Sequence, residues 1–320
     1  MNLQVVILAA GAGSRMKSKL PKVLHKVCGQ AMLHHVLDGA KSAGIKDCIT
    51  IIGHGAEEVR ASLDSDIKTV VQEDQLGTGH AVKMAYDMLI GEGTILVLNG
   101  DGPLIREETL RQLIDFHHGG GYKATVLTAD LEDPYGYGRI VRKNQNQLYK
   151  IVEEGDASQE EKEIREINSG LYCFDAKSLR ESLFKITNKN VQGEYYITDS
   201  LGIIMDMGGQ VGLYKTKDQE DIMAVNTRQQ LAQVEAIMQR RINQTHMDQG
   251  VTIIRPDQTY IEKGVEIGQD VIIYPGSILK GKTRIGPACT IGANTTIENS
   301  TIGARVNIQN STIIDSHLGH

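Results

Sequence analysis

The sequence predicts an α/β fold: a doubly wound, mostly parallel sheet followed by a parallel β-helix. Two patterns carry this prediction. Through residues 1–225, short β-branched runs alternate with helical patterns, and from residue 251 aliphatic residues recur every six positions. Strand–helix alternation with apolar strands is typical of a parallel sheet covered by helices on both faces. A six-residue repeat suits a β-helix, because each flat face contributes one inward aliphatic side chain.

The first domain is expected over residues 1–226, with its strands in short apolar runs. These runs are residues 3–8, 48–52, 69–72, 94–98, 124–128 and 211–214. Residues 31–43 carry an apolar stripe at helical spacing, which predicts a helix between the first two strands. Residues 227–250 show another such stripe, with Asn226 or Thr227 as its N-cap, and are expected to form a connecting helix or linker.

The predicted β-helix covers residues 251–320. Its inward positions, at intervals of six with one slip of a single residue, are Ile261, Ile267, Ile273, Leu279, Ile285, Ile291 and Ile297, then Ile302, Ile308 and Ile314. A β-rich domain with chance spacing is the alternative, and the unbroken first run disfavours it. The segment is long enough for about three or four coils.

Composition excludes several classes of protein. The formal net charge of −6 argues against a general nucleic-acid binder, which would spread Lys and Arg over a face. The four cysteines form no C-x-x-C pair, which argues against a disulfide framework or a zinc site and fits a reducing cytoplasm. The apolar start is too short to span a membrane. We therefore expect a cytoplasmic protein that binds neither nucleic acid nor membranes.

The opening segment points to an anionic ligand. No Asp or Glu precedes Asp38, whereas Arg15 and Lys22 belong to a local cluster of cations behind a Gly-x-Gly turn. Backbone N–H groups in such a turn, at the carboxyl end of a first strand, suit phosphate oxygens. Met16 stands where both the dinucleotide fingerprint and the P-loop require Gly, so both are rejected. Solvated surface cations are the alternative interpretation.

Two further motifs follow expected strands, and the residues alone allow two interpretations of each motif. Asp101 comes after the strand at 94–98, where its carboxylate could hold Mg²⁺ against phosphates or could belong to an exposed turn. Gln72 and the turn Gly77-Thr78-Gly79 follow the strand at 69–72. They could bind the edge of a base, or Thr78 could simply cap a helix.

The other polar residues, taken by themselves, are typical of ordinary structural positions. Gly138 is typical of a turn, Glu153 of a solvated acid and Asn168 of a strand edge. The pairs His34–His35 and His117–His118 have no Cys or acid at ligand spacing. They are therefore expected on the surface and not at a metal.

The ordered motifs resemble one enzyme family. "LAAGAGSRM" followed by "LPK" is similar to the signature of sugar-1-phosphate nucleotidylyltransferases, and "QLGTGHA", "GDGPLI", "DPYGYGRI", "EINSGLY" and "AVNTR" follow in the family's order. With the hexapeptide tail, the chain resembles the bifunctional uridyltransferase–acetyltransferases of that family. The resemblance implies a Rossmann-like nucleotidyltransferase domain and a left-handed parallel β-helix.

The resemblance also implies the site. It assigns Arg15 and Lys22 to catalysis, and Asp101 and Asn226 to the binding of Mg²⁺. The residues that it assigns to the nucleotide are Leu8, Ala9, Ala10, Gly11, Lys22, Gln72, Gly77 and Thr78. Those that it assigns to the sugar are Gly138, Glu153, Asn168 and Asn226. Asn99, Gly102 and Ala224 depart from the commoner family pattern, and Asn99 leaves sugar selectivity open.

The implied reaction joins UTP and N-acetylglucosamine-1-phosphate, giving UDP-N-acetylglucosamine and pyrophosphate for peptidoglycan and lipopolysaccharide precursors. The full-length family members also acetylate glucosamine-1-phosphate with acetyl-CoA and form homotrimers through the β-helix. We expect this chain to stop within the repeat, and therefore to keep uridylyl transfer and lack acetyl transfer.

Three rival functions remain at this point. The first is a glucose-1-phosphate uridylyl- or thymidylyltransferase that shares the glycine loop. The second is a non-catalytic nucleotide sensor assembled by the β-helix. The third is a nicotinamide oxidoreductase, which Met16 disfavours.

Overall fold

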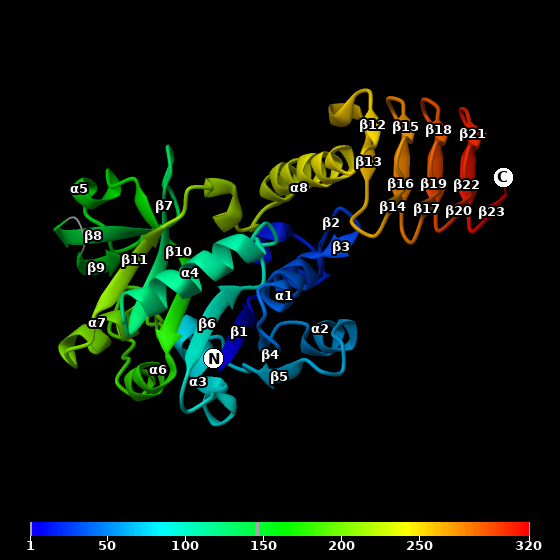
Figure 1. Ribbon diagram of the computed structural model, residues 1–320. Coiled ribbons are helices and arrows are strands. Elements are labelled where there is room, and N and C mark those ends of the chain that lie inside the picture. The colour runs from blue at the N-terminus through cyan, green and yellow to red at the C-terminus, as the bar shows by residue number, and fades with distance from the viewer. Residues whose placement is uncertain (1, 145–146, 320) are drawn as a thin grey trace. The chain divides into compact units, whose positions relative to one another are not determined.

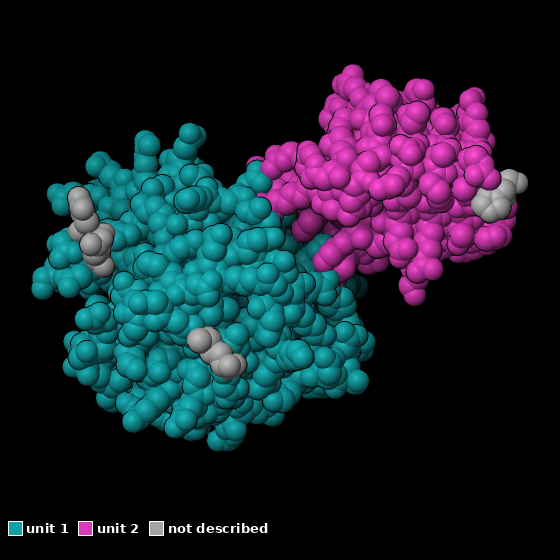
Figure 2. Space-filling model, viewed as in Figure 1, with its two compact units in different colours: residues 1–25, 32–227 teal, residues 26–31, 228–320 magenta. Residues whose placement is uncertain are grey.

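The computed structural model describes residues 2–144 and 147–319 (Figure 1). They form two compact units, which Figure 2 distinguishes by colour. The first unit comprises residues 1–25 and 32–227, and the second comprises residues 26–31 and 228–320. No helix in the described ranges is both long enough and apolar enough to cross a membrane.

The first unit alternates strands and helices. Its strands are β1 (Leu3–Ala9), β4 (Asp47–Ile52), β5 (Lys68–Val71), β6 (Thr94–Asn99), β7 (Ala124–Asp130), β8 (Gly138–Asn144), β9 (Gln147–Val152), β10 (Glu166–Asp175) and β11 (Val211–Lys215). Its helices are α1 (Met32–Ser42), α2 (Ala56–Ser62), α3 (Thr78–Met84), α4 (Glu107–Gly119), α5 (Gln159–Lys162), α6 (Ala176–Leu183) and α7 (Asp199–Asp206). Short 3₁₀ turns are η1 (Ser14–Met16), η2 (Lys22–Leu24), η3 (Tyr86–Met88) and η4 (Gln219–Ile222). Every strand predicted from an apolar run is present.

The sheet has the order β11-β7-β10-β6-β1-β4-β5. Strands β6, β1, β4 and β5 are parallel neighbours, as are β7 and β11, which confirms the mostly parallel prediction. Strand β10 is antiparallel to both β6 and β7, and it also pairs with β8, which continues to β9. None of these three strands was predicted from an apolar run. Strand β10 was missed because its central residues Asn168-Ser169-Gly170 interrupt the apolar run.

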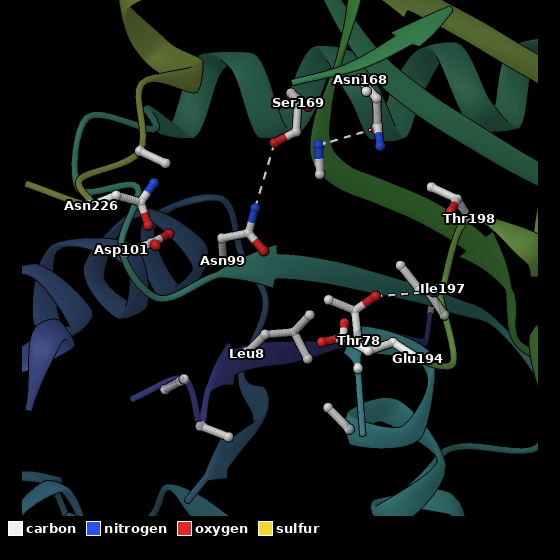
Figure 3. Close-up of a pocket in the computed structure, with 18 of the residues that line it drawn as sticks. Leu8, Thr78, Asn99, Asp101, Asn168, Ser169, Glu194, Ile197, Thr198 and Asn226 are labelled. Atoms are coloured by element: carbon white, nitrogen blue, oxygen red, sulfur yellow. Dashed lines mark hydrogen bonds between the residues drawn. The ribbon is translucent and has the colours of Figure 1, made fainter. Parts of the chain in front are cut away.

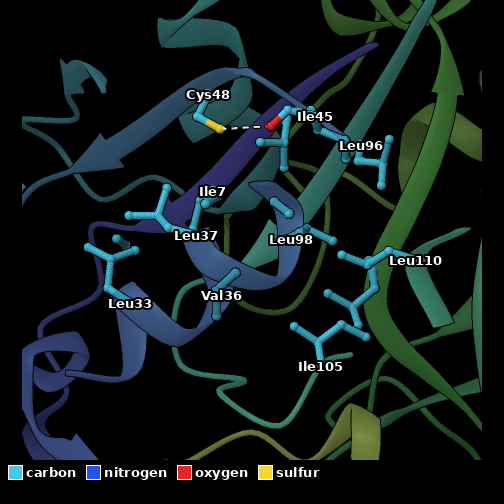
Figure 4. Close-up of a cluster of buried hydrophobic side chains, with 14 of the residues drawn as sticks. Ile7, Leu33, Val36, Leu37, Ile45, Cys48, Leu96, Leu98, Ile105 and Leu110 are labelled. Carbon is cyan, nitrogen blue, oxygen red and sulfur yellow. Dashed lines mark hydrogen bonds between the residues drawn. The ribbon is translucent and has the colours of Figure 1, made fainter. Parts of the chain in front are cut away.

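Helices cover both faces of the sheet because the apolar side chains of its strands alternate. In β1, Val5 and Ile7 pack in one cluster with residues of α1 and α4, while Val6 packs in the other with α3, α6 and α7. Figure 4 shows the first cluster, where Leu33, Val36 and Leu37 of α1 lie near Ile7. Each such side chain contributes about 1.5–3 kcal/mol when it is fully buried. The doubly wound prediction is confirmed.

The second unit contains a long helix, a small hairpin and stacked short strands. Helix α8 spans Arg228–Asp248, and the hairpin consists of β2 (Lys26–Val27) and β3 (Gln30–Ala31). The remaining elements are β12 (Thr252–Ile253), η5 (Pro256–Gln258), β13 (Tyr260–Ile261), β14 (Glu266–Ile267), β15 (Ile272–Ile273), β16 (Ile278–Lys280), β17 (Arg284–Ile285), β18 (Thr290–Ile291), β19 (Thr296–Glu298), β20 (Thr301–Ile302), β21 (Asn307–Ile308), β22 (Thr312–Ile314) and β23 (His317–Leu318). They form three parallel sheets of four strands each, which confirms the predicted β-helix.

The predicted six-residue phase of the β-helix is wrong at its last position. Ile297 pairs with Ile313, so Ile314 stands opposite Glu298 and is 51% exposed. The coil loses one residue at each of two corners, where Asn299 and Asn310 adopt positive φ values of 48° and 44°. Asn tolerates this left-handed conformation better than most residues, which suits it to these corners.

The histidine pairs were also predicted wrongly as surface residues. His35 and His117 are buried, and His117 Nδ1 lies 2.9 Å from Thr125 Oγ1. Burial, together with the neighbouring His118, lowers the pKa of His117 to about 4. Their spacing on amphipathic helices directs one member of each pair toward the core. These residues therefore serve packing.

The corner assignment can be tested with two substitutions. Ile297→Ala should lower the free energy of unfolding by about 2–5 kcal/mol, because it leaves a cavity in the β-helix core. Ile314→Ala should change it by less than about 0.5 kcal/mol, because that side chain is exposed. Urea denaturation measures both, and hydrogen exchange assigns the loss to the β-helix. Equal losses would contradict the second shortened corner.

Candidate functional site

A pocket of about 470 Å³ opens at the carboxyl ends of β1 and β6, within the first unit (Figure 3). This is the edge where ligands bind in open α/β sheets. The pocket is lined by Leu8, Ala9, Ala10, Gly11, Lys22, Val23, Gln72, Gln75, Gly77, Thr78, Ala81, Asn99, Asp101, Gly136, Tyr137, Gly138, Glu153, Asn168, Ser169, Gly170, Tyr172, Glu194, Ile197, Thr198, Ala224 and Asn226. All the predicted site residues except Arg15 are among them.

The glycine loop after β1 is shaped by close packing. Gly13 has φ 61°, and a Cβ at that position would lie 2.6 Å from Cβ of Lys22. The loop then forms η1, in which Met16 is buried. The side chain of Met16 therefore anchors the turn at the position where the rejected phosphate motifs would have Gly. The left-handed conformation of Gly13 and the buried side chain of Met16 together hold the loop beside Lys22.

Arg15 is not among the residues that line the pocket. It is exposed, and it belongs to η1 with the buried Met16. Successive residues of a 3₁₀ turn are about 120° apart, so burial of Met16 directs its neighbour toward solvent. The structure therefore does not bring Arg15 together with the other predicted residues, and its catalytic role stays a prediction.

Lys22 lies at the start of η2, after Pro21. Gly55 accommodates this turn, since a Cβ on Gly55 would lie 2.4 Å from Cγ of Pro21. The ammonium of Lys22 donates to the carboxylate of Asp101 and, at 3.0 Å, to Oδ1 of Asn226. Three polar groups from three separate parts of the chain therefore meet at one point.

Asp101 and Asn226 come together through backbone pairing. The N–H of Gly100 donates to the carbonyl of Leu8 at 2.9 Å, and the N–H of Val225 donates to the carbonyl of Asp101 at 2.9 Å. The two side chains consequently point toward one another at one end of the pocket (Figure 3). A carboxylate and an amide oxygen already converge on one cation, and hard oxygens are the ligands that Mg²⁺ prefers. This donor set therefore fits a magnesium ion that completes its coordination with water and phosphate.

The described residues offer no cluster of three His, Cys, Asp or Glu side chains for a metal. A metal at Asp101 and Asn226 would thus depend on a ligand's own oxygens. That dependence is typical of Mg²⁺ at phosphate-binding sites, where one or two carboxylates suffice.

A buried ionic network holds the segment that leads to Asn226. Asp221 of η4 is fully buried and accepts from Nε of Arg106 at 2.9 Å and from the hydroxyl of Thr109. Arg106 also donates to Asp218 at 2.5 Å. These contacts tie η4 to the start of α4, a few residues after Asp101. The network therefore fixes both segments that carry the predicted metal ligands.

One end of the pocket is formed by Gln72 and the turn into α3. Nε2 of Gln72 donates to the carbonyl of Gly77 at 3.1 Å and lies 3.0 Å from Nδ1 of His80. A carbonyl can only accept, so the amide nitrogen of Gln72 must face it. The oxygen of Gln72 is then the atom that this amide can offer to a ligand.

The turn at Gly77 requires glycine. Its φ is 105°, and a Cβ there would lie 2.6 Å from the carbonyl oxygen of Tyr195. The next residue, Thr78, begins α3 and accepts through its hydroxyl from the N–H of Ile197 at 3.0 Å (Figure 3). Thr78 therefore ties the turn to the segment before α7. The alternative in which Thr78 caps the helix does not apply, because the cap position belongs to Gly77.

The opposite wall is formed by a bulge in β10. The pairing with β7 jumps from Asn168–Thr128 to Tyr172–Val126, so β10 carries extra residues that leave the ladder. Gly170 in this bulge has φ 76°. The amide of Asn168 donates to the hydroxyl of Tyr172 at 2.8 Å and accepts from the N–H of Gly170 at 3.1 Å. The bulge thereby aims polar groups from the middle of a buried strand into the pocket.

Glu153 lies across from this bulge and is not a solvated acid. Burial raises its pKa, the bond from Thr198 opposes the rise, and Asp156 and Asp199 add to it. A Cβ on Gly138 would lie 3.2 Å from Oε2 of Glu153. Gly138 therefore leaves room beside the carboxylate, which an added side chain would crowd.

Sequence reasoning missed several lining residues, notably Gln75, Tyr137, Glu194 and Thr198. Asn99 had been noted only as a departure from the family pattern. Its place at the end of β6, two residues before Asp101, was a usable signal. Burial, and next the charge of Asp101, raise the pKa of Tyr137. Gln75 and Tyr137 lie within the motifs QLGTGHA and DPYGYGRI, which were also a usable signal, whereas Glu194 and Thr198 come from a segment without a strand pattern.

Comparison with known proteins gives one consistent answer. Residues 5–241 match the MobA-like NTP transferase domain, and residues 264–299 match the bacterial transferase hexapeptide (six repeats). The chain is 59% identical over 320 residues to the bifunctional protein GlmU of Alkaliphilus oremlandii, and 54% identical over 319 residues to that of Clostridioides difficile. Each alignment covers 100% of this chain and 70% of the relative.

Solved structures share the fold of the first unit at low identity. One is a putative glucose-1-phosphate thymidylyltransferase from Bacillus anthracis in complex with a sucrose, with a TM-score of 0.62 and 22% identity. It covers 73% of this chain and 94% of that one. Another is a UDP-glucose pyrophosphorylase complexed with UDP-glucose, with a TM-score of 0.64 and 16% identity, covering 75% and 100% of the two chains.

The buried network predicts a stability effect away from the pocket. Asp221→Ala should lower the free energy of unfolding by about 1.5–3 kcal/mol, because Arg106 and Thr109 lose a buried acceptor. Asp115→Ala, at an exposed position of α4, is the matched control and should change it by less than about 0.5 kcal/mol. Urea denaturation measures both. A loss for Asp221→Ala no larger than the control's would rule out a structural role for the network.

The raised pKa of Glu153 predicts a pH dependence of stability. Its folded-state pKa lies above its unfolded value, so its contribution is fully present below the unfolded pKa and is lost as pH rises through the folded one. Glu153→Gln does not titrate and escapes this loss. The stability of this variant relative to wild type should therefore increase between pH 4 and pH 7 in urea denaturation. A pH-independent difference would contradict the burial effect.

Proposed function

The chain belongs to the family of the bifunctional GlmU proteins, and from that premise we propose that it transfers UMP from UTP to N-acetylglucosamine-1-phosphate. The products are UDP-N-acetylglucosamine and pyrophosphate. One observation supports the proposal: Lys22, Asp101 and Asn226 converge at one end of a pocket at the carboxyl edge of the sheet, away from the acids Glu153 and Glu194 that also line it.

The reaction requires neutralisation of negative charge more than it requires transfer of a proton. A phosphate oxygen of the sugar phosphate forms a bond to the α-phosphorus of UTP, and the bond from that phosphorus to the bridging oxygen breaks. Pyrophosphate leaves with the electron pair. The attacking oxygen is already an anion at neutral pH, so no general base is required. The chain's task is to hold two polyanions in line and to neutralise the leaving group.

Lys22 and the glycine loop are proposed to serve the phosphates. Backbone N–H groups of Ala10 and Gly11 lie at the carboxyl end of β1, and the Lys22 ammonium lies at the same edge. We propose Mg²⁺ as the metal, held by Asp101 and Asn226, where it would supply positive charge against the developing pyrophosphate. Arg15 is exposed and does not line the pocket, so no step is placed on it.

We propose that Gln72 recognises the base of the nucleotide. Its Oε1 can accept from the N3–H of uracil, which cytosine lacks because its N3 is an acceptor. Its amide hydrogens already serve Gly77 and His80, which fixes the orientation of the side chain. A site that offers a buried acceptor rejects a base without the donor, because the acceptor would be left unpaired.

Asn168, Glu153 and Gly138 are proposed to bind the sugar. Asn168 is held by Tyr172 and by the backbone of the bulge, so its amide is presented in one orientation. The carboxylate of Glu153 can accept from ring hydroxyls, beside the space that Gly138 leaves. Asn99 lies between this group and Asp101, and is placed to influence the choice of sugar.

The finer biological setting is inferred from the family. We infer synthesis of cell-envelope precursors in the cytoplasm, homotrimers formed through the hexapeptide repeats, and acetyl transfer from acetyl-CoA to glucosamine-1-phosphate as the second activity of the family. The matching hexapeptide repeats support the last two inferences.

A glucose-1-phosphate uridylyl- or thymidylyltransferase is the second candidate, since the structural neighbours of the first unit bear such names. Release of pyrophosphate separates the two candidates. It should be fastest with UTP and the acetylated sugar phosphate, slower with dTTP or glucose-1-phosphate, and lost when EDTA removes the metal. A preference for glucose-1-phosphate would select the second candidate.

Lys22→Ala and Asp101→Ala should each lower turnover by about a hundredfold or more, since loss of one group aimed at the transition state costs about 2.7–4 kcal/mol. Steady-state pyrophosphate release measures the effect, and circular dichroism checks the fold. Lys19→Ala removes an exposed charge from the same segment and should keep turnover near wild type. Near-normal turnover in both site variants would refute the assigned roles.

A further inference from the structure

The Lys22 ammonium lies where a metal held by Asp101 and Asn226 would lie. It donates to the carboxylate of Asp101 and to Oδ1 of Asn226. The side chains of Lys22 and Asp101 are each only 14% exposed. One cation therefore already neutralises Asp101 and contacts Asn226 in a partly buried setting, where such a charge is poorly screened by water.

A divalent ion and this ammonium cannot share the two oxygens. Both are positive, and a metal ligated by these atoms would lie in contact with the Lys22 head group. Their repulsion in a poorly hydrated pocket is larger than in water. Binding of the metal therefore requires the ammonium to leave.

The chain is built so that the ammonium can leave without a backbone movement. Pro21 packs against Gly55, which fixes the start of η2, and Gly13 leaves room for the Lys22 stem. The four-carbon stem beyond Cα is flexible. Because Gly13 lies against that stem, phosphates bound at the glycine loop would be within its reach.

We propose that Lys22 is a resident counter-ion of the metal site, which nucleotide phosphate draws away so that a divalent cation can replace it. This inference rests on the proposed function. The exchange makes nucleotide and metal bind cooperatively, and linkage requires each to raise the affinity of the other by the same factor. Without nucleotide, Lys22 keeps the affinity for metal low.

The experiment is a calorimetric titration with Mn²⁺, a probe for oxygen ligands of this kind, in the absence of nucleotide. Lys22→Met should bind Mn²⁺ roughly tenfold more tightly than wild type, because the competing charge is gone. Lys22→Arg keeps the charge and should bind as weakly as wild type. Lys19→Met removes an exposed charge from the same segment and should also match wild type.

Unchanged or weaker binding by Lys22→Met would overturn the exchange, as would equally tight binding by Lys22→Arg. A second measurement uses wild type alone. Saturating Mn²⁺ should speed reductive methylation of Lys22, measured by mass spectrometry against Lys19, because the ammonium is released to solvent. No change in the rate at Lys22 would contradict the proposal.

The two levels of inference fail separately. Metal-dependent turnover of UTP, combined with wild-type affinity for Mn²⁺ in Lys22→Met, would overturn the exchange and leave the proposed function standing. Absence of uridylyl transfer, combined with tighter Mn²⁺ binding by Lys22→Met, would overturn the function and leave the exchange between ammonium and metal standing.

Discussion

The parallel pairing of β1 with β6 is the constraint on which the site depends. Its register places Leu8 opposite Asn99, so the glycine loop and the turn that carries Asp101 leave the sheet at the same level. The hydrogen bond from Gly100 to Leu8 extends the pairing by one residue. A shift of the register by one residue would reverse the faces of the buried side chains, which the two apolar layers forbid. The packed core therefore fixes the position of the pocket end that carries Asp101.

Charge at that end is balanced within the protein itself. A carboxylate as little exposed as Asp101 is costly unless it is paired, and Lys22 supplies the pair. The same arrangement keeps the oxygens of Asp101 and Asn226 together. The Arg106–Asp221 contact also fixes η4, which precedes the segment that carries Asn226. The pocket thus holds a positive charge against its own acid.

The end of the pocket that carries Asn168 follows a different principle. Strand β10 runs antiparallel through the middle of the sheet, and its bulge turns Asn168 toward the pocket. Residues 169–171 leave the ladder with β7, and Asn168 is then held by its own neighbours. The cost of a bulge inside a core is offset by these local hydrogen bonds. A polar surface therefore forms where a regular strand would have presented only apolar side chains.

Much of this protein was determined by local sequence. The apolar runs predicted six strands, the six-residue period predicted the β-helix, and the resemblance carried by the ordered motifs indicated half of the residues that line the pocket. Only the tertiary structure decided three things: that β10 enters the sheet, that Arg15 faces solvent, and that Lys22 bridges Asp101 and Asn226. The physical reason is the range of the interactions. Periodicity reports which side chains seek a core, but the partner of a charged group is chosen by residues far away in the chain, whose approach depends on the register of the sheet.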